Sequence, residues 1–230
     1  MNLAVAEELA KQLADLLRPF CERIEGAGGI RRRKPDPHDI ELVAVPKLRK
    51  EIVSTPLGTT VESGRLVNTL DERVRLLELL LSIERDDPVQ QVRRSRTGVG
   101  TETVLIRAPF SEKYYRFKFR GEKADLFVVT PPAQWGATFA IRTGDAEFSH
   151  RLVQQGYAKG LHEHAGHLER WRDRGGALVT SIYPVEGMSR ETIDTPEEAD
   201  YFAALGVPYV EPELRVTTET SVKEWEATAR

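Results

Sequence analysis

Apolar residues at helical spacing open the chain and return in its later parts. Over residues 3–20 they recur every three or four positions, which predicts an amphipathic helix. A capping box opens a second predicted helix over residues 70–85, where leucine and valine again follow helical spacing. Two more helices are expected, one over about residues 147–157 and one that begins near Pro196 and ends before Gly206.

Between these helices, runs rich in β-branched and aromatic residues predict strands. Residues 39–45 alternate and then become wholly apolar before Pro46, as in a strand that enters a buried sheet. Further strands are expected over residues 103–107, 114–119, 124–129 and 177–183. Helices packed on a mixed sheet, followed by a smaller lobe, make an α+β protein.

Two prolines, Pro131 and Pro132, interrupt the pattern and divide the chain. We expect a first lobe over residues 1–131 that carries the chemistry and a small α+β lobe over residues 132–215. Residues 216–230 are acidic and are expected to form a disordered tail.

Composition narrows the class of protein. The chain has 230 residues with a net charge of −3, which argues against a protein that coats nucleic acid through bulk positive charge. No apolar run approaches the ~18 residues that a membrane span needs. The single cysteine, Cys21, excludes an intramolecular disulfide and a multi-cysteine zinc site. We expect a soluble cytoplasmic protein that is a monomer and has no membrane partner.

Three acidic residues stand out against their apolar surroundings. Asp39 and Glu41 are two apart on a predicted strand, so their side chains leave the same face of the sheet. Asp125 occupies a similar position at the start of another apolar strand. Carboxylates gathered in this way suit hard cations such as Mg²⁺. Spacing alone favours the alternative that all three are strand-end residues in solvent.

A glycine-rich turn precedes the first of these strands. Gly28 and Gly29 leave bare backbone N–H groups that an anion can approach, and residues 31–34 are all basic. The turn therefore predicts a phosphate site beside the acidic residues. Taken alone, a Gly-Gly pair followed by arginines is also typical of a surface turn.

The order of these motifs resembles that of the family X DNA polymerases of the nucleotidyltransferase superfamily. The palm of that family carries Gly-Ser-x-Arg-Arg-Gly, a short spacer, Asp-x-Asp on a strand and a third Asp on a later strand. Residues 28–33, Asp39, Glu41 and Asp125 follow this order. The resemblance extends into the second lobe, which in this family is called the thumb. In all it covers about residues 5–215 and is weakest over residues 47–115.

The resemblance implies a nucleotidyltransferase palm and the chemistry of a DNA-directed DNA polymerase in DNA repair or replication. It implies two Mg²⁺ ions, with Mn²⁺ expected to substitute, on three acids: Asp39, Glu41 and Asp125. The residues implied to bind the incoming nucleotide are Gly28, Gly29, Arg32, His38, Thr143, Gly144 and Asp145. Residues expected to meet nucleic acid are His150, Arg116, Lys118 and Arg120.

Departures from the family pattern keep alternatives open. Glu41 replaces an Asp, Gly29 replaces a Ser, and His38, where the family commonly has Gly, either contacts the triphosphate or fills the turn. Ile141 and Arg142 replace the aromatic pair beside the sugar, so the choice between dNTP and NTP is undecided. The expected partner is a primer–template or gapped DNA. The alternatives are a template-independent nucleotidyltransferase acting on a nucleic-acid end or small acceptor, and an inactive palm that binds nucleic acid.

Three histidines gather in the second lobe, His162, His164 and His167, with Glu163 as the acid beside them. We expect ordinary surface or packing histidines, with a metal site as the alternative.

Overall fold

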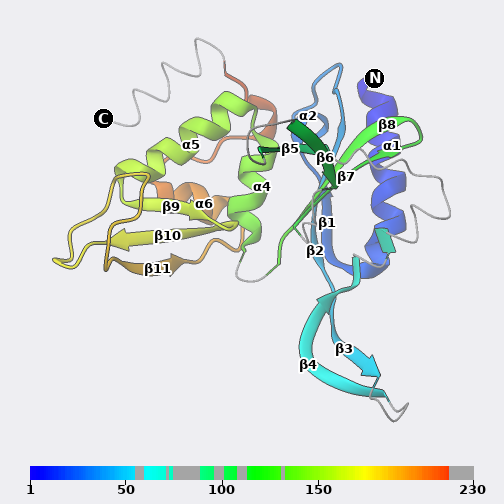
Figure 1. Ribbon diagram of the computed structural model, residues 1–230. Helices are drawn as coiled ribbons and strands as arrows, with labels where there is room; N and C mark the ends of the chain where they lie inside the picture. Colours follow the sequence, from blue (N-terminus) through cyan, green and yellow to red (C-terminus); the bar gives the residue numbers. More distant parts are fainter. Residues whose placement is uncertain are drawn as a thin grey trace.

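A mixed four-stranded sheet forms the centre of the first lobe in the computed structural model (Figure 1). The structure describes residues 1–54, 60–70, 73–74, 89–95, 101–107, 113–130 and 133–217. In spatial order the strands of this sheet are β1 (Cys21–Gly26), β2 (Ile40–Pro46), β8 (Glu122–Val128) and β7 (Tyr114–Phe119). The β2–β8 pair is parallel and the other two pairs are antiparallel. This sheet and its helices confirm the expected α+β class.

One face of the sheet is covered by α1 (Leu3–Leu17). The helix begins where the Asn2 side chain accepts a hydrogen bond from the Val5 N–H, which satisfies an otherwise unpaired donor. Its buried side chains pack on the even-numbered positions of β2 and β8. The 3₁₀ turn η1 (Arg18–Phe20) then leads into β1.

The opposite face packs against α4 (Trp135–Thr143). Val43 of β2 and Phe127 of β8 form one buried cluster with Trp135 and Phe139 of this helix. Because side chains alternate along a strand, the odd-numbered positions of β2 and β8 all face α4. Glu41 and Asp125 are odd-numbered and therefore point toward the second lobe.

The second lobe is built from helices packed on a three-stranded antiparallel sheet, which lies beside the first sheet in Figure 1. After α4 its elements are α5 (Ala146–Ala158), β9 (Leu161–His164), β10 (His167–Arg172), β11 (Ser189–Ile193), α6 (Glu198–Leu205) and the 3₁₀ turn η2 (Pro212–Leu214). Its core joins buried side chains from α5, the sheet and α6, among them Phe148, Leu168 and Phe202.

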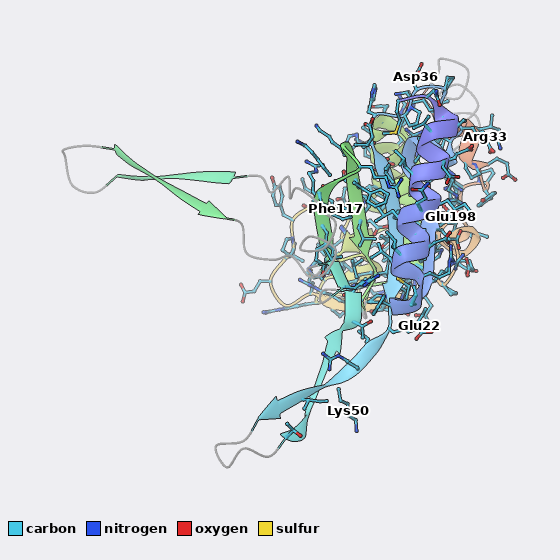
Figure 2. The ribbon with its side chains drawn as sticks, turned by 90° about the vertical axis from the view of Figure 1, so that its right-hand side faces the viewer. Glu22, Arg33, Asp36, Lys50, Phe117 and Glu198 are labelled. Carbon is cyan, nitrogen blue, oxygen red and sulfur yellow. The ribbon has the colours of Figure 1, made fainter. Side chains whose placement is uncertain are left out.

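Two antiparallel hairpins project from the body of the molecule in different directions (Figure 2). One joins β3 (Leu48–Ser54) to β4 (Thr60–Asn68), and the other joins β5 (Val89–Ser95) to β6 (Thr101–Arg107). The strand predicted over residues 103–107 is the second strand of the latter hairpin.

The strand predicted over residues 177–183 is wrong. Apart from one isolated bridge between Leu178 and Arg172, this segment makes no strand pairing, and Ile182 and Tyr183 are exposed. The third strand of the sheet is instead β11, which pairs with β10. Because β11 consists mostly of polar residues, it shows no alternation of apolar side chains from which a strand could be predicted.

The last helix begins two residues later than predicted. Glu197 and Asp200 form its capping box, whereas Thr195 is buried and its N–H and hydroxyl both donate to the Gln134 side chain. The predicted stop at Gly206 is confirmed, with φ of 63° at the helix end.

Several other predictions fall on undescribed segments. Of the helix over 70–85, residues 70, 73 and 74 are described and are helical, and the rest lies outside the described residues. The proline break at 131–132 and the tail from 218 onward also lie outside them, so the lobe boundary and the disordered tail stay predictions. In the ranges that the structure describes, no helix combines the length and apolarity needed to cross a bilayer.

Candidate active site

Glu41 and Asp125 lie side by side on the face that meets α4. They are register partners on the parallel strands β2 and β8, and Asp39 comes directly before β2. Paired residues on adjacent strands project from the same face of a sheet. The backbone thus places two of the three predicted metal ligands next to one another and the third two residues away.

The pKa of Glu41 reflects the acidic side chains around it. Burial and the negative charge of Asp39 raise the pKa of Glu41 to about 7, and Asp125 adds to the effect. Arg32 and a hydrogen bond from the Gly29 N–H act in the opposite direction. A cation bound beside Glu41 would stabilise its carboxylate and so favour release of the proton to solvent.

The Glu41 side chain lies against the glycine turn. Gly28 begins α2 (Gly28–Arg31) with a φ of +54°, a conformation that favours glycine. A Cβ on Gly28 would stand 1.4 Å from Oε2 of Glu41, so the carboxylate occupies space that any other residue would fill. The predicted phosphate turn and the predicted metal ligand are therefore in direct contact.

Asp125 is held by two side chains of β7. Its Oδ1 accepts hydrogen bonds from the Tyr114 hydroxyl at 2.8 Å and from Nε of Arg116 at 2.8 Å, and its Oδ2 accepts one from Nη2 of Arg116 at 3.1 Å. Burial and the neighbouring Asp125 carboxylate raise the pKa of the Tyr114 phenol. Arg116 was expected to meet nucleic acid, and that role stays a prediction.

As the side chains stand, the three acids do not form one compact ligand set. Within the described residues, one group of three His, Cys, Asp or Glu side chains has all its ligand atoms within 4.8 Å of one another, and it lies in the second lobe. The carboxylate oxygens, their backbone positions and the crowding around Glu41 fit a hard divalent ion. The Oε2 atom of Glu41 lies instead against Gly28.

Two arginines of the glycine turn tie it to the second lobe. Arg32 donates to the Thr143 carbonyl at 2.5 Å. Arg31 places both terminal nitrogens on the Glu198 carboxylate, at 2.8 and 2.6 Å, and also donates to the Thr143 hydroxyl at 2.7 Å. Its guanidinium lies 3.9 Å from the centre of the Phe139 ring. Sequence reasoning missed Arg31, because its partners are more than a hundred positions away.

The turn over Thr143–Asp145 is fixed by local contacts. A Cβ on Gly144 would lie 2.6 Å from Oγ of Ser149 and 2.7 Å from the Phe148 ring, so a larger residue here would have to displace these side chains. Asp145 caps α5 by accepting the Phe148 N–H, and it also accepts the Thr217 N–H. Partial burial would raise the pKa of Asp145, but these hydrogen bonds hold it below its usual value. A role against the incoming sugar and base stays a prediction.

A cavity of about 260 Å³ lies between the lobes. It borders Phe127, which is the next residue of β8 on the face that carries Asp125. Phe127, Lys113, Ile141 and Arg142 are among its lining residues. The Arg142 guanidinium lies 4.2 Å from the centre of the Phe127 ring, which also stacks on Tyr114. The cavity therefore combines an aromatic face with positive charge.

The other predicted binding residues lie at the surface. His38 is exposed before β2, His150 is exposed on α5 and Arg120 is exposed in the turn between β7 and β8. Lys118 is half-buried on β7, on the same side of the strand as Arg116.

Comparison with known proteins identifies the fold. No family model and no curated protein matches the chain. Among solved structures, the chain is similar to polymerase beta of Leishmania infantum in a ternary P/T complex, with a TM-score of 0.56 and 17% identity over 94% of this chain and 76% of that one. The chain thus has the polymerase beta fold, as the resemblance to family X polymerases implied.

Proposed function

We propose that this chain is a DNA-directed DNA polymerase of the family X type, which adds nucleotides to a primer 3′-hydroxyl or into a short gap during DNA repair or replication. The observation that carries the proposal is the register pairing of Glu41 with Asp125, beside the Gly28 turn, in a chain with the polymerase beta fold. Acids and an anion-binding turn at one place are what metal-assisted phosphoryl transfer requires.

Asp39, Glu41 and Asp125 would hold two divalent ions, Mg²⁺ or Mn²⁺. When bound, such ions stabilise the attacking and leaving oxygens of an in-line displacement. The chain itself contributes three acids of the right kind and must free Glu41 of its proton, since its pKa is about 7. Tyr114 and Arg116 orient the Asp125 carboxylate, which we assign to the primer hydroxyl.

The incoming nucleotide would lie between the two lobes. The N–H groups of Gly28 and Gly29 and the guanidinium of Arg32 would take its phosphates, with His38 at the edge of the turn. Arg32 already reaches the Thr143 carbonyl, so one side chain joins the phosphate turn to the turn that we assign to the sugar and base, Thr143, Gly144 and Asp145. The cavity beside Phe127 gives the base a flat apolar neighbour.

DNA would meet the chain through scattered basic groups, because its net charge is −3. Lys118 and Arg120 on β7 and its turn, and His150 on α5, supply such groups. With few phosphate contacts, binding should be weak, distributive and sensitive to salt.

The test is single-nucleotide extension of a labelled primer. We would compare a gapped template, an open template and single-stranded primer, in Mg²⁺ or Mn²⁺, with each dNTP and each NTP. Asp125→Asn should remove activity. Asp15→Asn, which alters an exposed carboxylate of α1 far from the site, is the matched control and should retain it.

The outcomes separate the candidate functions. Incorporation that follows the template base and is lost in Asp125→Asn supports the polymerase, and the NTP reactions give its choice of sugar. Untemplated addition would instead identify a nucleotidyltransferase that acts on an end or a small acceptor. DNA binding without incorporation in either metal would identify an inactive palm.

A further inference from the structure

A tight hairpin in the second lobe brings three metal-ligating side chains to one face of its sheet. The turn between β9 and β10 consists of Ala165 and Gly166, both with positive φ, of 53° and 88°. It makes His164 and His167 the closing register pair of the hairpin. Glu169 lies two residues beyond His167 on the same strand, so all three side chains project from the same face.

The distances between these side chains match those of a tetrahedral metal site. Oε1 of Glu169 lies 2.9 Å from Nε2 of His167 and 3.6 Å from Nδ1 of His164, and the three ligand atoms all fall within 4.8 Å of one another. Zinc bonds of the usual length to His and Glu, at tetrahedral angles, separate ligand atoms by about 3.3 Å. The observed distances bracket that value.

The surroundings prepare Glu169 to act as a ligand. Trp171 donates its indole N–H to Oε2 at 2.7 Å, which orients the carboxylate and leaves Oε1 directed at the histidines. A metal ion at this site would take the place of the hydrogen bond between Nε2 of His167 and Oε1 of Glu169.

The histidines differ in exposure, which gives an ion a path to the site. His167 is buried, and in the described part of the chain its Nδ1 has no hydrogen-bond partner. The side chain of His164 is 51% exposed. An ion can reach the site at His164 and bind deeper at His167 and Glu169.

We propose that His164, His167 and Glu169 bind one Zn²⁺ ion, or a similar borderline transition metal, with water in the fourth position. Two imidazoles and one carboxylate suit such ions and disfavour Mg²⁺, which takes oxygen ligands. The site is separate from the three acids of the first lobe and does not depend on the proposed polymerase activity. Its effect is to fasten the β9–β10 hairpin.

The test measures zinc affinity of the full chain after removal of bound metal with a chelator. Zn²⁺ is titrated against a chromophoric competitor in excess Mg²⁺, which occupies the oxygen ligands of the first lobe. We expect one equivalent bound, and His164→Ala to weaken binding at least about tenfold. Because His164 is exposed, this variant keeps the core intact. His150→Ala removes an exposed histidine of α5 and should leave zinc affinity unchanged.

Two further measurements make the test decisive. Co²⁺ in place of Zn²⁺ should give the strong visible absorption of a tetrahedral site in the unaltered chain and not in His164→Ala. Zn²⁺ should raise the thermal unfolding midpoint of the unaltered chain and of His150→Ala, but not of His164→Ala. Equal zinc affinity in the unaltered chain and His164→Ala, or equal loss in His150→Ala, would overturn the proposal.

Discussion

The carboxylate of Glu41 rests on Gly28, so closely that a Cβ at residue 28 would stand 1.4 Å from Oε2. The chain's own anion thus occupies the turn whose N–H groups we assign to the phosphates of a nucleotide. Binding of a nucleotide and divalent ions would move this side chain toward Asp39 and Asp125, where its charge is needed. The Cβ of Glu41 would also lie 3.1 Å from a Cβ at residue 28, so the side chain runs along the turn.

The first prediction concerns Gly28. Gly28→Ala should lower the free energy of unfolding by on the order of 2 kcal/mol, because Ala at this φ is strained and its Cβ meets Glu41. Gly26→Ala is the matched control, since a Cβ there has nothing within 4 Å. Urea unfolding of both variants measures the difference.

A double variant separates the two causes of that loss. Glu41→Asp shortens the side chain that a Cβ on residue 28 would meet, so it should recover part of the stability lost in Gly28→Ala while the backbone strain remains. Strictly additive effects of the two substitutions would show that Glu41 does not lie on the turn.

The second prediction is a pH dependence due to Glu41. Its pKa is about 7 in the folded chain against an ordinary 4.5. Between these values the folded chain keeps a proton that the unfolded chain has lost, so the free energy of unfolding falls as pH rises through this window. Glu41→Gln removes the effect and should be more stable than the unaltered chain at pH ~8 by on the order of 2 kcal/mol.

Denaturant unfolding in EDTA at several pH values checks this. The two proteins should coincide near pH ~3.5, about one unit below the ordinary pKa, where the carboxyl is protonated in both states, and diverge above it. Mg²⁺ should then stabilise the unaltered chain at high pH and stabilise Glu41→Gln less. A stability difference that stays constant with pH would contradict the assignment.

How far the sequence predicted this site can be judged from particular residues. Alternation along residues 39–45 correctly predicts a buried strand that carries Glu41, although Asp39 lies in the bend just before it. The Gly28-Gly29 pair predicts a tight turn. Both are local properties of the sequence. The contact of Arg116 with Asp125 depends on strand register, which no local pattern gives.

Ion pairs between residues far apart in the chain could not be predicted from the sequence either. Arg31 looked like one more basic residue of the phosphate turn, yet it binds Glu198, 167 positions away. In the segment 177–183, apolar residues suggested a strand, but strand formation also needs a partner, and β10 pairs with the polar β11 instead. Two ligands of the proposed metal site, His164 and His167, were noticed in the sequence as part of a group of histidines. The third ligand, Glu169, can be recognised only when the register of the hairpin is known.

The third prediction concerns the ion pair between Arg31 and Glu198, whose side chains are 21% and 7% exposed. Arg31→Ala should lower the free energy of unfolding by about 2 kcal/mol, because it removes the contact with Phe139 and one of two arginine partners of the buried Glu198 carboxylate, the other being Arg215. Arg174→Ala is the matched control. It breaks an ion pair with Glu186 in which the side chains are 72% and 95% exposed, so the change should stay within about 0.5 kcal/mol. Equal effects of the two variants would show that Arg31 does not join the lobes.

The last prediction separates two roles for Arg116, as the group that orients Asp125 and as a contact to DNA. If orientation dominates, Arg116→Ala should lower kcat about 10- to 100-fold while DNA affinity and its salt dependence change little. Arg116→Lys should not restore kcat, since an ammonium cannot make the paired hydrogen bonds of a guanidinium to both carboxylate oxygens.

Arg120→Ala, at the exposed turn of the same strand, should show the opposite pattern, with weaker DNA binding, a smaller salt slope and unchanged kcat. Single-turnover extension with salt titration of DNA binding measures both quantities. Weaker DNA binding with unchanged kcat in Arg116→Ala would mean that its hydrogen bonds to Asp125 do not position the carboxylate for the reaction.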